Sequence, residues 1–440
     1  VKSTKEANDK LLILEDTNLD GKADKTTVFA DKLHMPMGFA LGEGGVFIAA
    51  GRDLLFLKDE DGDDRSDSRE VYFTGFGTGD THQNINSLTW SPDGELYFTQ
   101  GLHSFSRVET PWGIVRLDEH GAWRLRPRRR QLQAFPRIIG GGNPWGIEFG
   151  STGEVFVKSN GRSFGDLLPA LIPDYTGLDG VPSVGETKVK SMIVKKIDSP
   201  HFSEDIQGDI LIAGYMAGDI NRLSLDKTGS SFGSTLKENL LDSTSRSFRP
   251  VDIQIGPTGA LYIADWFNPI IGHYQASLRH PDRDKTHGRI WRITEKGRPL
   301  AVRPELVSLN VEQLIKKLSS SRSWERYHAK RLLSQREPSE VVSKVQKWVL
   351  ETKTDEELLE ALYVLASHEF VDDHLLKRLL ISKNNQIRGV AARMVGRWAD
   401  RLNRPLDFLK VSIKDNHPRV RLESMVAASN VKDPESIKVI

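Results

Sequence analysis

The chain has 440 residues, of which 38% are hydrophobic and 28% are charged, and it contains no cysteine. At about 150 residues per domain this length predicts two or three domains. Lys and Arg number 61 against 60 Asp and Glu, a balance that argues against a dedicated nucleic-acid binder. No apolar run approaches the roughly 20 residues of a membrane span, and the absence of cysteine excludes disulfides and thiolate metal sites within these residues.

A turn with glycine followed by a short alternating strand recurs along the first part of the chain. It occurs at residues 44–48, 91–98, 151–157, 207–212 and 256–263. The glycines that anchor it lie about 50 residues apart, at Gly45, Gly94, Gly153, Gly208 and Gly259. Because tight hairpin turns need positive φ, we expect these glycines to occupy the turns.

A second strand pattern follows most copies of the first, at residues 53–57, 113–117, 219–223 and 288–293. Units of about 50 residues that each hold several short strands are typical of propeller blades. Residues 11–14 look like the second strand pattern of a unit whose first pattern is missing. We therefore predict an all-β six-bladed propeller over residues 1–297, with its first blade truncated, and keep a β-sandwich as the alternative.

The composition changes between residues 297 and 305, after which Leu, Ala, Lys, Arg and Glu dominate. Apolar residues then recur at helical spacing, in residues 324–333, 358–366, 387–395 and 420–428. Stacked helical hairpins of this kind form solenoids. Residues 298–440 are therefore predicted to form an all-α HEAT-like solenoid that is incomplete at its C-terminus.

Two acidic loops have the ligand spacing of calcium sites, in which oxygen ligands alternate along a turning loop. The first loop places its acidic and amide residues at positions 1, 3, 5 and 9, namely Asp16, Asn18, Asp20 and Asp24. The second loop offers Asp59, Asp61, Asp63, Asp67 and Glu70. Each loop is predicted to bind Ca²⁺, and the alternative is a pair of solvated acidic turns.

A polar loop at residues 79–86 carries His82 and precedes the strand pattern of its unit. Inner strands of a propeller line the central channel, where ligands bind. Since histidine titrates near neutral pH, His82 is a candidate general base, and the alternative is a histidine hydrogen-bonded to neighbouring carbonyls. Arg249 lies before a later strand pattern and suits an anionic ligand, unless Asp252 pairs with it.

The loop at residues 272–288 is rich in groups that bind metals. It holds His273, His280, Asp282, Asp284 and His287. Their spacing matches no standard template, so a metal site and a solvated polar loop both remain open.

Several segments together resemble one family, the PVC-type haem-binding proteins, which are also called membrane-bound dehydrogenases. The resemblance is carried by residues 74–82, 108–113, 143–146, 248–252 and 265–292, and the last of these is the most specific. It implies an exported protein with a sugar-dehydrogenase-like propeller, HEAT repeats and a terminal c-type cytochrome domain. The haem-binding Cys-x-x-Cys-His sequence of that domain is absent here, so haem c would belong to sequence beyond Ile440.

The propeller is similar, more remotely, to the soluble quinoprotein glucose and sorbosone dehydrogenases. That similarity implies that His82 removes the proton of a sugar hydroxyl while hydride passes to pyrroloquinoline quinone. It also implies that Asn143 and Arg249 contact the quinone. At three places where those enzymes carry cationic contacts, this chain instead has Gly142, Ala217 and Ser247.

The resemblance implies the propeller–HEAT portion of an exported dehydrogenase, periplasmic or membrane-associated. It would oxidise a sugar or polyol and pass electrons to a cytochrome domain outside this sequence. Because the chain begins at Val1 without a signal-like apolar stretch, we expect that a targeting segment precedes it. The alternative is a non-catalytic propeller that binds a carbohydrate or a protein, with the helical solenoid docking a protein partner. Neither reading involves nucleic acid.

Overall fold

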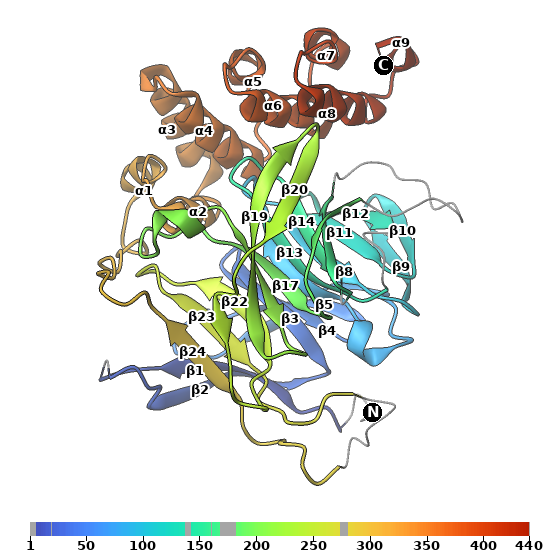
Figure 1. The fold of residues 1–440 in the computed structure, drawn as a ribbon. Coiled ribbons are helices and arrows are strands. Elements are labelled where there is room, and N and C mark those ends of the chain that lie inside the picture. Colours follow the sequence, from blue (N-terminus) through green and yellow to red (C-terminus); the bar gives the residue numbers. More distant parts are fainter. Residues whose placement is uncertain are drawn as a thin grey trace. The chain divides into compact units, whose positions relative to one another are not determined.

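The computed structural model describes residues 6–18, 20–136, 142–159, 161–167, 182–272 and 280–439. The chain divides into two compact units. The first unit comprises residues 1–90, 96–136 and 142–144, and the second unit comprises residues 91–95, 137–141 and 145–440. Figure 1 labels the helices and strands of both units.

The first unit contains two antiparallel four-stranded sheets, each consisting of neighbouring strands. One has the order β3 (Pro36–Gly42), β4 (Gly45–Ala50), β5 (Asp53–Lys58) and β6 (Ser68–Thr74). The other contains β7 (Asn86–Trp90), β8 (Leu96–Gln100), β11 (Gly121–Arg126) and β12 (Gln131–Pro136). Strands β1 (Asp9–Glu15) and β2 (Lys25–Leu33) form a separate two-stranded sheet. Phe29 and Leu33 of β2 pack in one apolar core with Val46, Ile48 and Leu55.

A hairpin of β9 (Phe105–Thr110) and β10 (Gly113–Asp118) interrupts the second of these sheets in the sequence. The third strand of that sheet is β11, which pairs directly with β8. The prediction that residues 113–117 form a blade strand is therefore wrong. The segment has the right pattern because both strands of a hairpin alternate in the same way as a blade strand.

The second unit contains three further antiparallel sheets. The first consists of β13 (Pro144–Phe149), β14 (Val155–Ser159), β15 (Ser163–Leu167) and β16 (Ser183–Glu186). The second consists of β17 (Met192–Lys196), β18 (Ile210–Gly214), β19 (Asp219–Thr228) and β20 (Ser231–Leu236), with β21 (Leu241–Asp242) paired to β19. The third consists of β22 (Pro250–Ile255), β23 (Leu261–Asp265) and β24 (Arg289–Ile293).

The turn glycines behave as expected in four of the five copies. Gly94, Gly153, Gly208 and Gly259 have φ between 70° and 92°. In the first copy the positive φ belongs to Gly44, at 76°, whereas Gly45 already starts β4. Gly45 is required for a different reason, because a Cβ atom there would lie 2.4 Å from the carbonyl oxygen of Leu57.

The C-terminal part of the second unit is helical. Its helices are α1 (Val311–Lys317), α2 (Ser323–Leu333), α3 (Pro338–Glu351), α4 (Asp355–Ser367), α5 (Asp373–Leu380), α6 (Asn385–Arg397), α7 (Pro405–Ser412), α8 (Pro418–Ser429) and α9 (Ser436–Val439). The four predicted helical segments correspond to α2, α4, α6 and α8. Helices α5 and α7 lie in one layer and α6 and α8 in another (Figure 1). A single apolar core runs through these helices and includes Leu362, Val390 and Trp398.

Within the second unit, helices bind the turns that join blade strands. Arg393 of α6 donates to the carbonyl oxygen of Gly153 at 2.6 Å, and Arg419 of α8 donates to the carbonyl oxygen of Ser230, in the turn between β19 and β20, at 3.0 Å. The turn at residues 91–95 belongs to this unit, where Arg397 pairs with Asp93 at 2.6 Å. Arginines of the even-numbered helices therefore fasten the helical part to the turns of its own unit.

The chain thus contains a β-propeller, seen as five blade-like sheets in the described residues, and a helical C-terminal part. A sixth blade and the HEAT character of the helices stay predictions. The boundary between residues 297 and 298 also stays a prediction. Strand β24 ends at Ile293 and α1 begins at Val311.

Candidate active site

His82 lies in a short 3₁₀ helix, η2 (Thr81–Gln83), directly before β7 in the first unit. Its Nδ1 atom lies 2.5 Å from Oδ1 of Asp80. The His82 side chain is 32% exposed and that of Asp80 is 15% exposed. When Nδ1–H donates a hydrogen bond to a carboxylate, Nε2 is left as the acceptor of the neutral ring. The sequence predicts His82 as a base by its residue type but gives no sign that Asp80 is its partner.

Two side-chain amides face the other ring nitrogen of His82. The amide nitrogen of Gln83 lies 3.3 Å and that of Asn143 lies 3.5 Å from Nε2. Gln83 also donates to Oδ2 of Asp80 at 2.9 Å. The structure therefore brings His82 and Asn143 together in the first unit. This arrangement can accept a proton at Nε2 and donate amide N–H groups to an oxygen beside it.

The residues that follow His82 in the chain form a buried polar layer. Asn86 accepts from the hydroxyl of Thr99 at 2.8 Å and donates to the carbonyl oxygen of Asn84 at 2.9 Å. Asn84 is fully buried, yet neither polar atom of its side chain has a partner in the described residues. Buried amides normally have a partner, so this layer calls for an ordered water or a ligand group. No sequence signal distinguishes Asn84 from an ordinary loop asparagine.

Arg249, the predicted anion-binding residue, belongs to the second unit and is held by backbone carbonyls. Its guanidinium donates to the carbonyl oxygens of Arg246 (2.8 Å), Asn268 (2.9 Å) and Tyr215 (3.2 Å). Burial lowers its pKa, and the nearby charge of Asp265 opposes that shift. The alternative in which Asp252 pairs with Arg249 is wrong. Asp252 instead accepts the backbone N–H of Ile253 at 2.8 Å.

The residues present do not fit a tricarboxylate quinone. In the first unit, a Cβ atom on Gly142 would lie 1.8 Å from Cδ1 of Leu102, so an arginine there would displace Leu102. In the second unit, Ala217 and Ser247 carry no charge, and carbonyls already take the donors of Arg249. A ligand with three carboxylates needs cationic partners to offset its desolvation. We therefore derive no catalytic step through pyrroloquinoline quinone.

The first acidic loop turns its side chains toward its own backbone. The predicted ligands are Asp16, Asn18, Asp20 and Asp24. Asp16 and Asn18 both accept the backbone N–H of Asp20, at 3.1 and 2.9 Å. The hydroxyl of Thr17 donates to Asp24 at 2.8 Å and lowers the pKa of that carboxyl. These contacts order the loop as a series of polar turns.

The second acidic loop brings three of its five predicted ligands together. Asp59, Asp61 and Asp67 each offer an oxygen atom within 4.8 Å of the other two. Each of the three also accepts a backbone N–H group of the loop. Asp63 accepts the backbone N–H of Arg65 at 2.8 Å and lies outside the group, and Glu70 pairs with Arg130. Three clustered carboxylate oxygens are a donor set that suits a hard cation such as Ca²⁺.

The histidine-rich loop does not gather its side chains around one point in the described residues. His273 lies outside the described residues. His280 lies 3.9 Å from Asp282, and His287 lies 2.8 Å from Asp284, as separate pairs. Among the residues that the structure describes, only the group in the second acidic loop has three ligands within reach of one ion.

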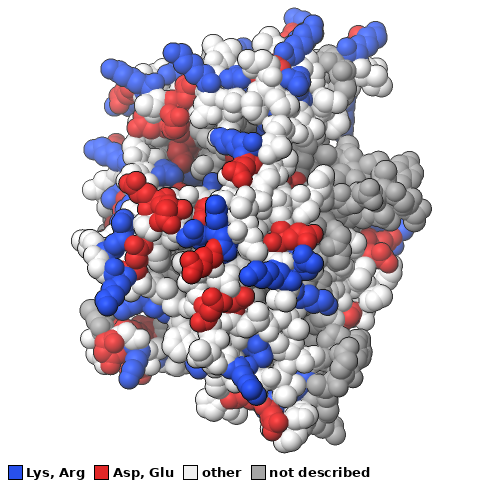
Figure 2. Space-filling model, in the orientation of Figure 1, with Lys and Arg blue, Asp and Glu red and all other residues white. Residues whose placement is uncertain are grey.

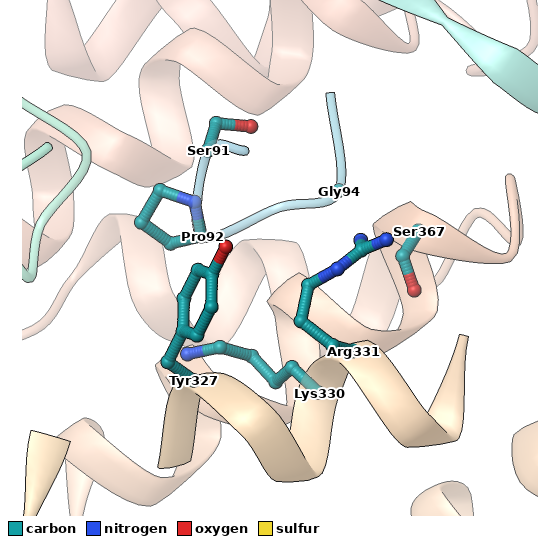
Figure 3. Close-up of a pocket in the computed structure, with 7 residues that line it drawn as sticks. All are labelled: Ser91, Pro92, Gly94, Tyr327, Lys330, Arg331 and Ser367. Carbon is teal, nitrogen blue, oxygen red and sulfur yellow. The ribbon is translucent and has the colours of Figure 1, made fainter. Parts of the chain in front are cut away.

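A pocket of the second unit lies between the turn at residues 91–94 and helices α2 and α4 (Figure 3). Its lining residues are Ser91, Pro92, Gly94, Tyr327, Lys330, Arg331 and Ser367. Lys330 already pairs with Glu360. Burial raises the pKa of Tyr327, which keeps its hydroxyl protonated. None of the predicted site residues lines this pocket.

Acidic and basic side chains are mixed over the face shown in Figure 2, in keeping with their nearly equal numbers in the sequence. In the described part of the chain, no helix has both the length and the apolar character needed to cross a membrane.

Comparison with known proteins gives one family match. A family described as a domain of unknown function (DUF7133) matches residues 2–193 and 187–297. No match was found among curated proteins.

Solved structures with some likeness to this chain include three enzymes. A luciferin-regenerating enzyme has 11% identity and a TM-score of 0.41, covering 62% of this chain and 82% of its own. A glucose dehydrogenase has 15% identity and a TM-score of 0.35, and the match covers 61% of this chain and 98% of that enzyme. The soluble aldose sugar dehydrogenase from Escherichia coli has 12% identity and a TM-score of 0.33, and the match covers 54% of this chain and 95% of that enzyme.

Proposed function

Because the chain belongs to the DUF7133 family, whose description assigns no function, we propose a function from its own residues: His82 acts as a general base on a hydroxyl group of a sugar or polyol. The observation that carries this proposal is the contact between Nδ1 of His82 and Asp80, at 2.5 Å. It fixes the ring so that Nε2 can receive a proton.

Each residue of this site has a separate role in the proposal. Nε2 of His82 takes the hydroxyl proton, and the carboxylate of Asp80 stabilises the imidazolium that forms. The amide groups of Asn143 and Gln83, at 3.5 and 3.3 Å from Nε2, donate to the hydroxyl oxygen and hold it in place. Removing a proton from a hydroxyl is a step shared by dehydrogenases and other enzymes that act on sugars.

The finer reading is an exported oxidoreductase of the PVC-type haem-binding group, periplasmic or membrane-associated. Its base would act as hydride leaves the sugar carbon. Electrons would finally pass to a c-type cytochrome domain outside this sequence. Since the residues present do not fit pyrroloquinoline quinone, the hydride would pass in this reading to an uncharged quinone or a flavin, which gains two electrons as the sugar carbon becomes a carbonyl.

Ca²⁺ is part of the proposal as a structural ion of the acidic loops. The three clustered carboxylates of Asp59, Asp61 and Asp67 support it in the second loop. The first loop offers Asp16 and Asp20 on a turn that is already ordered by its own hydrogen bonds. Neither loop takes part in the chemistry of His82 in this proposal.

A second candidate function is a non-catalytic propeller that binds a carbohydrate or a protein. The occupied guanidinium of Arg249 favours it, because an arginine held by three carbonyls has few donors left for a cofactor. The side-chain amides around His82 serve a binding role as well as a catalytic one. In this reading the helical part docks a protein partner.

Two assays on the purified full chain separate these functions. Calorimetry with pyrroloquinoline quinone should give no heat of binding. Dye-linked oxidation of a panel of sugars and polyols should give turnover with at least one of them. His82→Ala should then lower kcat by about 10²–10⁴. Asp80→Asn should lower kcat with little change in KM, because Asp80 acts through the ring of His82.

The control for these variants is His374→Ala, since the side chain of His374 is 93% exposed. It should keep the turnover of the unaltered chain. Absence of turnover with any dye, together with measurable binding of a glycan, would favour the binding module. Full activity of His82→Ala would exclude His82 as the base.

A further inference from the structure

Aromatic side chains remain exposed where β23 ends and β24 begins in the second unit. Trp266 is 43% exposed and Trp291 is 42% exposed. The indole N–H of Trp291 donates to Asp265 at 3.0 Å, which fixes the ring on the sheet. Indole rings that are held rigidly and left exposed are common in binding sites, because they offer contact area at a low cost in conformational entropy.

Phe267 lies beside these residues in an unusual backbone conformation. Its φ is 50°, in the left-handed region that bulky residues rarely adopt. The carboxylate of Asp265 accepts its backbone N–H at 2.8 Å. Its ring then lies 3.8 Å from the guanidinium carbon of Arg289. Strained backbone of this kind concentrates at functional sites, where a side chain must be held in one place.

A second aspartate–histidine pair borders the same ring. Nδ1 of His287 lies 2.8 Å from Asp284, and the side chain of His287 is 70% exposed. The His287 ring lies edge-on to Phe267, with 6.3 Å between ring centres. Backbone N–H groups, first that of Thr286, lower the pKa of Asp284 to about 2. Asp284 is thus charged and holds the ring, and Nε2 of His287 has no partner among the described residues.

The charged groups of this cluster are already held by partners. Arg289 is neutralised by Asp265, whose side chain is fully buried, at 2.8 Å. Asp284 is occupied by His287. The guanidinium of Arg289 lies over the Phe267 and Trp291 rings, 3.8 and 5.0 Å from their centres. What remains accessible is the exposed part of the Trp291 ring and of the His287 ring. Because these charged groups already have partners, an ionic ligand gains little here, whereas exposed ring surface beside polar groups matches a sugar ring with its C–H face and hydroxyls.

We propose that Trp291, Phe267, His287 and Arg289 form a binding site for a neutral carbohydrate. This site goes beyond the function proposed for His82, because none of its residues takes part in the base chemistry. Its role would be to retain a polysaccharide at the second unit whether or not the chain is an enzyme.

Affinity electrophoresis of the full chain tests this site. The gels contain soluble galactomannan, dextran or hydroxyethyl cellulose as neutral probes, and alginate as an anionic probe. At least one neutral polysaccharide should retard the chain. Trp291→Ala and His287→Ala should each weaken that retardation at least tenfold. Phe267→Asn should do the same while keeping the melting temperature, because asparagine tolerates the left-handed conformation.

Two control variants test whether the retardation arises at the proposed site. Trp112→Ala removes another indole, 56% exposed and part of the first unit, and should leave retardation unchanged. His374→Ala, at an exposed histidine of the helical part, should also leave it unchanged. The turnover of Trp291→Ala should match that of the unaltered chain, which separates this proposal from that for the base.

Four results would overturn the proposal. These are retardation by none of the neutral polysaccharides, stronger retardation by alginate, equal retardation of the three site variants and the unaltered chain, or a self-association of the chain that Trp291→Ala abolishes.

Discussion

Arg249 and Lys158 are cations that backbone carbonyls hold in place of carboxylates. Lys158 is fully buried in β14 and donates to the carbonyl oxygens of Ser159 and of Gly161, the latter at 2.8 Å. Carbonyl groups belong to every residue, so the sequence carries no sign of them. This is why the sequence suggests Asp252 as a partner of Arg249 and predicts nothing for Lys158.

Lys158 should make stability depend on pH. Burial lowers its pKa to about 7, whereas an unfolded lysine keeps its proton up to about pH 10.4. Between these values the unfolded chain binds more protons, so stability rises with pH. Urea unfolding at pH 6.5 and 9.5 measures the free energy of unfolding of Lys158→Met and of the unaltered chain. The excess stability of Lys158→Met should be larger at pH 6.5. As the pH rises, this difference in the free energy of unfolding should shrink by up to about 1.4 kcal/mol per pH unit.

Parallel pH profiles of the two chains would contradict the lowered pKa. Lys227→Met is the control, since that exposed lysine of β19 binds the side chain of Gln386 on the surface. Its profile should follow that of the unaltered chain.

At the scale of elements, the even-numbered helices and the blade turns depend on each other. Tyr363 of α4 donates to the carbonyl oxygen of Ser151 at 3.3 Å, and Gln386 of α6 donates to Glu154 at 2.9 Å. Both contacts reach the turn that joins β13 to β14. The sequence predicted the turn and the helices, but not their contact, because more than 200 residues separate the partners.

Arg397 is more deeply buried than Arg393 and Arg419. Its side chain is 5% exposed and pairs with Asp93 at 2.6 Å and Glu369 at 3.3 Å. Arg397→Met leaves buried carboxylates without their cation, so the free energy of unfolding should fall by about 3–5 kcal/mol. Arg404→Met is the control, because its pair with Asp407 is exposed and should contribute less than about 1 kcal/mol. Urea unfolding of both variants measures the difference, and equal losses would argue against the buried pair.

The second acidic loop contains its own matched pair for a calcium test. Asp61 belongs to the group of three clustered carboxylates and Asp63 does not. Calorimetry should show Ca²⁺ binding more strongly than Mg²⁺, because the flexible loop does not impose octahedral geometry. Asp61→Asn should remove most of the heat and Asp63→Asn little of it. Asp20→Ala reports on the first loop, and equal, negligible heats from it and the unaltered chain would reject that site.

At the scale of the whole molecule, two repeating patterns made the fold class predictable. Glycine turns before alternating strands indicated the blades, and apolar residues at helical spacing indicated the helices. The polar site was less predictable. His82 stood out by residue type, but Asp80 and Asn84 acquire their roles only from distances and burial. The two-stranded sheet of β1 and β2 leaves the sixth blade a prediction.

The contacts of Arg393, Arg397 and Arg419 predict that the second unit unfolds as one body. Circular dichroism at 222 nm follows the helices, and amide exchange in β14 and β18 follows the sheets. Both signals should be lost at the same urea concentration. If the helices unfolded alone, the buried carboxylates of the blade sheets would lose their arginine partners, which is costly. Loss of the helical signal at a clearly lower concentration would show that the helical part is held only loosely.

The hairpin of β9 and β10 has a practical consequence for protein engineering. Strands β8 and β11 pair without it, so the chain already accommodates extra sequence at that point. Its tip, between Thr110 and Gly113, is exposed. A reporter domain, an epitope or a new pair of termini placed there would leave the ladder of its sheet intact. The turn at residues 91–95 offers no such freedom, since Asp93 is committed to Arg397.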